Sequence, residues 1–290
     1  MAPLPPTAAL AVSYAHCDTM VRQGDKDRWL AALFAPADRR ADLMALHAFN
    51  LEIASVRERV SDPLPGEVRL QWWRDVLNGE GRGDVMAHPV AGALLDVVGR
   101  HNLPIKPLLD LIDARVFDLY DDPMPSTVDL EGYCGETSAA LMQMAALVMA
   151  EGDDPRTADL AGHAGIAYAV TGLVRSVGRH ASRGQVFIPA DMLAAEGLGR
   201  DEVVTGRDSP ALRRVRQAMI ALARRHHLAA AALVGTADRR TCAAFLPLAT
   251  VLPRLTRLER HQDPFASPPD VPQWRLQWAM WRWAGRFGRG

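Results

Sequence analysis

Apolar side chains recur every three or four positions along most of the chain, beginning near Asp38. This spacing places them on one face of an α-helix, whereas a half-buried strand would alternate apolar and polar residues. Such alternation is rare here, and β-branched clusters are few. The pattern therefore predicts an all-α protein. We expect helices at about residues 38–60, 66–78, 87–101, 105–121, 127–150, 157–181, 208–235 and 238–260.

Proline and glycine separate the predicted helices. They interrupt the apolar pattern at residues 63–66, 79–81 and 152–155. A further break at residues 265–269, Phe-Ala-Ser-Pro-Pro, isolates the C-terminal segment. We therefore predict one helical domain over residues 1–264, and a Pro-rich linker with a Trp- and Arg-rich contact helix over residues 265–290.

Composition narrows the class of protein. The chain has 290 residues and is 49% hydrophobic, which is enough for one substantial core, and its net charge of −1 gives no reason to expect a nucleic-acid partner. Cys17, Cys134 and Cys242 have no CxxC spacing, which favours a reducing compartment. The N-terminus lacks a basic signal region, and no apolar run is long enough to span a membrane. We expect a cytoplasmic protein, free or peripheral on the inner membrane.

The C-terminal segment combines tryptophan with arginine. Trp274, Trp278 and Trp281 recur at positions i, i+4 and i+7, and no acidic residue follows Asp270. Indoles along one helix face, with arginines beside them, suit a helix that lies on a membrane surface. The same face could instead cover the bundle or dock a partner helix. Both alternatives make this segment a contact element.

Residues 173–189 carry the most specific motif. Leu173-Val174-Arg175, Val177-Gly178, Arg183-Gly184 and Phe187-Ile188-Pro189 resemble the second signature of the squalene/phytoene synthase family. Residues 40–50 are similar to the run into that family's first aspartate motif. The resemblance implies a single isoprenoid-synthase-like bundle around a central cavity. In the family, carboxylates on two facing helices hold Mg²⁺ and a prenyl diphosphate in such a cavity.

Three of the four carboxylate positions have changed in this chain. By the resemblance they fall at Ala54, Glu58, Ser176 and His180. Mg²⁺ takes hard oxygen ligands, so serine is a poor ligand, and imidazole suits softer metals. We therefore assign no catalytic residue and expect no metal or other cofactor. A lone histidine such as His180 at a helix end is more often structural than a metal ligand or an acid–base group.

Arginines stand near the altered positions. Arg175 and Arg179 are four residues apart and share one helix face. Together with Arg183 they could form an anion site that faces the cavity. Alternatively, Arg175 pairs with a buried acid such as Asp113 or Glu58, and the other two are solvated. A buried arginine needs a partner in either case.

Further landmarks point to one branch of the family. Residues 27–29, 48–52 and 71–74 resemble the branch that includes a mitochondrial assembly factor of respiratory complex I, which also departs from the aspartate motifs. The resemblance implies a non-catalytic assembly or binding factor, whose partner is a respiratory complex subunit or an isoprenoid or other lipid. The alternative is an active head-to-head prenyl diphosphate transferase of isoprenoid biosynthesis, which would need Mg²⁺. Its displaced ligands would be Glu52, Glu58, Asp110 or Asp113.

Overall fold

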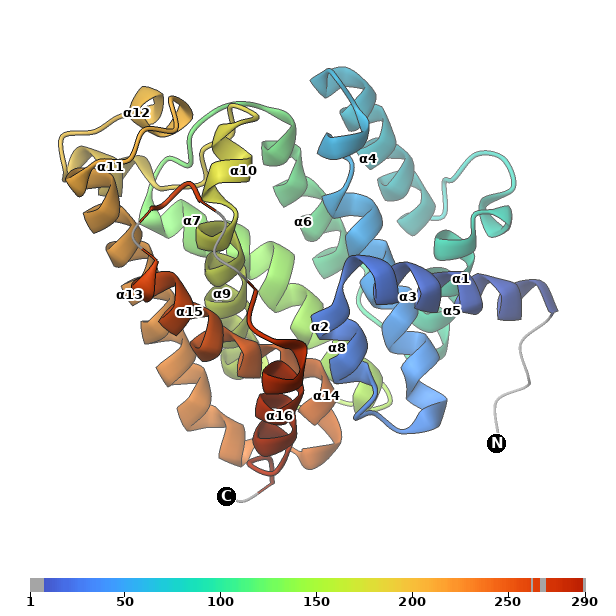
Figure 1. Ribbon diagram of the computed structural model, residues 1–290. Coiled ribbons are helices and arrows are strands. Elements are labelled where there is room, and N and C mark those ends of the chain that lie inside the picture. The colour runs from blue at the N-terminus through green and yellow to red at the C-terminus, as the bar shows by residue number, and fades with distance from the viewer. Residues whose placement is uncertain (1–7, 262, 267–269, 289–290) are drawn as a thin grey trace.

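The computed structural model describes residues 8–261, 263–266 and 270–288. Regular secondary structure within these ranges is helical throughout, without a strand. Figure 1 shows the N-terminal helices on one side of the bundle and the C-terminal helices on the other, with the middle of the chain between them. The all-α prediction is confirmed.

Several helices begin where the sequence supplies a side-chain cap or an early proline. The Ser209 hydroxyl accepts a hydrogen bond from the Leu212 amide at 3.1 Å, just ahead of a proline, and α13 begins there. The first half of the described chain forms α1 (Ala8–Gly24), α2 (Lys26–Ala32), α3 (Ala37–Ala54), α4 (Pro63–Leu77), α5 (Pro89–Arg100) and α6 (Lys106–Ala114). The second half forms α7 (Thr127–Cys134), α8 (Ala140–Met149), α9 (Ala158–Arg175), α10 (Val177–Ala181), α11 (Ala190–Ala194), α12 (Arg200–Val204), α13 (Pro210–Leu233), α14 (Cys242–Phe245), α15 (Val251–Arg260) and α16 (Gln273–Ala284).

Helix α9 lies at the centre of this arrangement. It packs along α13 on one side and against a π turn, Gly135–Ala139, on the other. Gly165 makes the second contact possible, because a methyl group at this position would lie 2.6 Å from the Ala139 Cβ. This close packing fixes the C-terminal end of α9, which carries the motif residues.

Two segments that we predicted as single helices are interrupted in the structure. The segment predicted as one helix over residues 238–260 is broken into α14, a 3₁₀ turn at Leu246–Thr250, and α15. Pro247 lies in that turn, and a proline lacks the amide hydrogen that an uninterrupted helix needs. The helix predicted over residues 157–181 is interrupted at Ser176, so α9 and α10 are separate helices.

Other differences concern the N-terminal part of the chain. Helix α3 ends at Ala54 rather than near residue 60, and a 3₁₀ turn, Arg57–Arg59, follows it. Helices α1 and α2 precede the first predicted helix. The buried positions of α1 are Ser13, Cys17 and Val21, which are small or weakly apolar, so its sequence gives little amphipathic signal.

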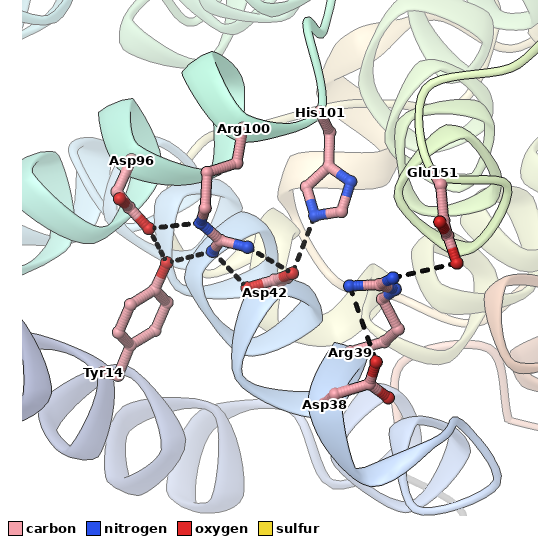
Figure 2. Close-up of polar contacts among 8 residues, drawn as sticks. All are labelled: Tyr14, Asp38, Arg39, Asp42, Asp96, Arg100, His101 and Glu151. Atoms are coloured by element: carbon pink, nitrogen blue, oxygen red, sulfur yellow. Dashed lines mark hydrogen bonds and ion pairs between the residues drawn. The ribbon is translucent and has the colours of Figure 1, made fainter. Parts of the chain in front are cut away.

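A polar network joins α1, α3 and α5 (Figure 2). Asp42 of α3 has a side chain only 3% exposed, and it accepts hydrogen bonds from Arg100 at 2.6 and 3.1 Å and from His101 at 2.7 Å. Arg100 also donates to Asp96 at 2.8 Å and to the Tyr14 hydroxyl at 2.6 Å. These hydrogen bonds and ion pairs, centred on the buried Asp42, connect α1, α3 and α5.

Candidate functional site

A cavity of about 310 Å³ lies inside the bundle, near the end of α3, the π turn and the junction of α9 with α10. Asn50 and Ala54 contribute from α3, and Thr137 and Ser138 from the π turn. The interruption at Ser176 lies on the same wall. The fold therefore brings both family signatures to one hollow, although they are more than a hundred residues apart in the chain.

The four altered motif positions do not all lie on this cavity. Ala54, Ser176 and His180 line it. Glu58 does not, because α3 ends at Ala54 and Glu58 belongs to the following 3₁₀ turn. Its carboxylate instead accepts a hydrogen bond from Arg183 at 2.7 Å in a half-exposed pair. Arg183 is not among the residues that line this cavity, and anion binding by Arg175, Arg179 and Arg183 stays a prediction.

Three arginines of the wall already hold carboxylates. The pairs are Arg28 with Asp25 at 2.6 Å, Arg115 with Asp118 at 2.9 Å, and Arg254 with Asp27. Asp25 is the only acidic residue among the described residues of the wall, and Arg28 neutralises it. These arginines are consequently occupied in holding the bundle together.

Arg175 and Arg179 are the wall arginines with weak or no acidic partners. Arg175 lies 3.6 Å from Asp270, whose side chain is 84% exposed. Arg179 donates to the Ser176 hydroxyl at 3.2 Å, and we find no carboxylate paired with it in the described chain. Solvent-exposed ion pairs contribute little, so both guanidinium groups are available to an anion.

The alternative partners expected for Arg175 are wrong. Asp113 pairs with Arg74 at 2.6 Å, and Glu58 pairs with Arg183. Both acids are therefore paired with other arginines. Arg175 therefore lines the cavity with only the exposed Asp270 as an acidic partner in the described chain.

The wall does not suit a Mg²⁺ cluster. Residues 8–261, 263–266 and 270–288 contain no group of three or more His, Cys, Asp or Glu side chains placed to share a metal ion. A magnesium site needs several oxygen ligands, mainly carboxylates and phosphates. Here the one carboxylate on the wall is held by Arg28.

Three buried polar atoms of residues that line the cavity have no hydrogen-bond partner within the described chain. They are Ser138 Oγ, Arg115 Nε and Arg254 Nε. Ser138 is 6% exposed, and burying a polar group without a hydrogen bond is unfavourable.

His180 is held in its neutral form. Burial, reinforced by the nearby charges of Arg179 and Arg183, lowers the pKa of His180 to about 4, and only Glu58 opposes this. Its ring lies 4.8 Å from that of Phe187. At neutral pH the histidine therefore adds no charge to the cavity, and the positive potential comes from arginine alone.

This lowered pKa predicts a pH dependence of stability. The unfolded chain protonates His180 near pH 6.5, whereas the folded chain resists protonation until about pH 4. Between pH 6.5 and 4 the unfolded chain binds a proton at this histidine that the folded chain does not. The free energy of unfolding therefore falls by about 1.4 kcal/mol for each pH unit as the pH is lowered through this range, and above pH 6.5 it is unaffected. His180→Gln should reduce the measured slope by up to about 1.4 kcal/mol per pH unit, while other buried histidines such as His227 keep their contributions. Urea unfolding between pH 6.5 and 4 measures it, and an unchanged slope would show that His180 is not buried neutral.

Sequence reasoning missed part of the wall. Tyr168 donates to Asp27 at 3.1 Å, and the guanidinium group of Arg28 lies 4.9 Å from the centre of the Tyr168 ring. Arg254 reaches this cluster from α15, whose existence as a separate helix was not predicted. The run at residues 27–29 was the only available signal, and it carried no information about these distant partners.

The C-terminal segment forms a helix on the outside of the bundle. Helix α16 packs against the 3₁₀ turn Leu246–Thr250. Trp274, Trp278 and Trp281 are 63%, 55% and 67% exposed, so the indole stripe faces away from the core. None of the described helices combines the length and apolar content needed to cross a bilayer.

Comparison with known proteins agrees with this architecture. A sequence model of the squalene/phytoene synthase family matches residues 21–282. A dehydrosqualene synthase crystal structure superimposes with a TM-score of 0.78, covering 95% of this chain and 96% of that one at 17% identity. At such low identity the likeness concerns the fold, which is that of the isoprenoid synthases.

Two kinds of curated relatives match. Complex I assembly factor 6 of NADH dehydrogenase (ubiquinone) from Rattus norvegicus is 32% identical over 190 residues, which are 66% of this chain and 57% of that protein. Phytoene synthase 1, chloroplastic, from Arabidopsis thaliana is 27% identical over 208 residues, 68% of this chain and 48% of that protein. The chain thus spans about half the length of these relatives.

Proposed function

Because the chain belongs to the squalene/phytoene synthase family, we propose that it is a member without Mg²⁺-dependent prenyl transfer, and that it acts in the assembly of respiratory complex I. The observation that carries this proposal is the cavity wall. Its described residues include several arginines and a single carboxylate, and that carboxylate is bound to Arg28. A diphosphate leaving group needs its charge neutralised by metal ions held in place, which requires free oxygen ligands.

Similarity to the assembly factors supports the proposed role in complex I assembly. The rat assembly factor shares 32% of aligned residues with this chain, and the Arabidopsis phytoene synthase shares 27%. The altered motif positions and this similarity favour the same conclusion. The partner we propose is a respiratory complex subunit, and no cofactor takes part.

Complementation of a gene deletion tests the function. We expect the deletion to lower NADH:quinone oxidoreductase activity and to leave the isoprenoid profile unchanged, and we expect the wild-type gene to restore the activity. Arg175→Ala should complement less well than Ser176→Ala, since the charge of Arg175 lies at the cavity and Ser176 only accepts from Arg179. A deletion that changes isoprenoids and leaves the oxidoreductase intact would instead support the prenyl transferase alternative.

We also propose that the cavity binds the anionic head of an isoprenoid-like or other lipid. Within the described chain, Arg175 has only the exposed Asp270 as an acidic partner at 3.6 Å, Arg179 has no ion pair, and both residues line the cavity. A metal-free clamp of guanidinium groups can hold phosphate oxygens directly. The proposed ligand therefore needs no Mg²⁺.

Titration calorimetry with inorganic diphosphate, in the presence of a chelator, measures this binding. Arg179→Gln should weaken the affinity by roughly 10- to 100-fold, since a hydrogen bond to a charged group contributes about 1.5 to 3 kcal/mol. Arg183→Gln is the matched control on the next turn, and it should change affinity by less than about threefold because Arg183 faces Glu58 outside the wall. Equal losses in both variants, or binding only with Mg²⁺, would refute the clamp.

A further inference from the structure

Helix α16 carries two apolar stripes. Leu276, Met280 and Trp283 are buried, and they recur at i, i+4 and i+7. Each exposed tryptophan of the other stripe precedes one of them by two residues. Two residues correspond to about 200° around a helix, so the stripes lie on opposite faces. A helix that only covered the bundle would need the inner stripe alone.

The inner stripe is sufficient to hold α16 in place. The Trp283 ring lies 5.3 Å from that of His227 on α13. Just beyond the helix, Phe287 stacks on Phe245 of α14 with 6.3 Å between ring centres. Figure 1 shows α16 beside α14 and α15 at the end of the bundle. The inner stripe thus anchors this helix, while most of the surface of the three indoles stays exposed.

Arginines accompany the exposed indoles. The guanidinium groups of Arg275 and Arg282 lie 5.2 and 4.7 Å from the ring centres of Trp274 and Trp278. A hollow of about 640 Å³ adjoins the start of the stripe, and its charged lining consists of Arg257, Arg260 and Arg275. We find no ion pair between these arginines and an acid of the described chain, and α16 contains no acidic residue.

We propose that the exposed face of α16, with the adjoining arginine hollow of α15, docks the protein on a membrane that contains anionic phospholipid. Indoles settle at the level of the lipid headgroups, and guanidinium groups bind the phosphates. The arrangement favours a lipid surface over a protein partner, because protein interfaces gather aromatic residues at a centre with a polar rim. Here arginines are interleaved with the indoles along the whole stripe. The inference goes beyond the proposed role in assembly and does not depend on it.

Flotation of the full chain with phospholipid vesicles tests the proposal. Wild-type protein should float with vesicles of phosphatidylcholine and phosphatidylglycerol in equal amounts, should float weakly with phosphatidylcholine alone, and should be released by high salt. The triple variant R257Q/R260Q/R275Q should bind the anionic vesicles on the order of 100-fold more weakly, given about 1 kcal/mol for each surface arginine. W274S/W278S/W281S should lose binding to a similar extent.

Matched variants control for charge and for exposed apolar area. R69Q/R82Q/R207Q removes three exposed arginines elsewhere, and L64S/V68S removes two exposed apolar side chains of α4. Both should float like wild type. Because all substituted side chains are at or near the surface, circular dichroism and thermal melting should show folded variants. Should a variant fail to fold, quenching of wild-type tryptophan fluorescence by brominated phosphatidylglycerol supplies a second measurement.

The proposal is overturned if the wild-type chain does not float at any lipid concentration and brominated lipid leaves its fluorescence unchanged. It is equally overturned if the stripe variants float as well as wild type, or if the controls lose as much binding as the stripe variants. Binding of a protein through the indoles without any vesicle binding would assign this face to a protein partner and refute the membrane surface.

Discussion

Replacing Asp42 with asparagine should lower the free energy of unfolding by about 3 kcal/mol. Asp42 is the most buried member of the network in Figure 2, and it bonds Arg100 and His101 together. Burial disfavours its charge, but the hydrogen bonds from His101 and Arg100 outweigh burial and lower the pKa of the carboxyl. It is therefore charged at neutral pH, and its loss leaves the buried His101 and the Arg100 guanidinium without their shared anion. Urea unfolding at pH 7 measures the change.

Asp96→Asn is the matched control for this prediction. Asp96 binds the same guanidinium group at 2.8 Å and the Tyr14 hydroxyl at 2.5 Å, but its side chain is 25% exposed. Water can replace much of what it provides, so we expect a loss within about 1 kcal/mol. If the two variants were equally destabilised, burial of Asp42 would not be the source of its contribution.

Gly165→Ala should destabilise the bundle by about 2 kcal/mol or more. The added methyl group would lie 2.6 Å from the Ala139 Cβ and closer still to the Ala139 backbone, which belongs to the π turn. A backbone cannot move aside as a flexible side chain can, so either α9 or the π turn must shift. Thermal or urea unfolding measures the loss, and the same variant should weaken diphosphate binding because both segments line the cavity.

Gly162→Ala, in the same helix, separates packing from helix propensity. A methyl group at Gly162 would meet nothing within 4 Å. Alanine favours the helix over glycine by about 0.5 to 1 kcal/mol, so this variant should be unchanged or slightly more stable. A comparable loss in both variants would contradict the close approach of α9 to the π turn.

Long helices with a clear apolar face could be predicted from the sequence. The expected helix over residues 208–235 corresponds to α13, Pro210–Leu233, because Ser209 and Pro210 mark its start and apolar residues recur along one side. The expected helix over residues 87–101 corresponds to α5, Pro89–Arg100, for the same reasons. In both, local sequence and tertiary packing demand the same conformation.

Elements that depend on tertiary contacts could not be predicted. Pro247 marks a break in an apolar stretch that looks helical, but the sequence does not show that a 3₁₀ turn, packed against α2 and α9, takes the place of the helix there. The π turn before α8 leaves no signal in the sequence, since its five residues differ little from a helix.

The candidate site was only partly within reach of the sequence. Spacing within the motif placed Arg175 and Arg179 on one face, and both line the cavity. The sequence did not predict that α3 ends at Ala54. Because it ends there, Glu58 lies outside the helix and pairs with Arg183. Pairings between distant segments, such as Arg254 with Asp27, need the folded structure.

The central claim is that this cavity no longer supports Mg²⁺-dependent prenyl transfer. The most direct measurement is incubation of the purified full chain with Mg²⁺ and either farnesyl or geranylgeranyl diphosphate, followed by mass spectrometry of the extracted products. We predict no head-to-head condensation product and no diphosphate release above that of a protein-free control. A Mg²⁺-dependent C30 or C40 hydrocarbon product that disappears with a chelator would contradict the account.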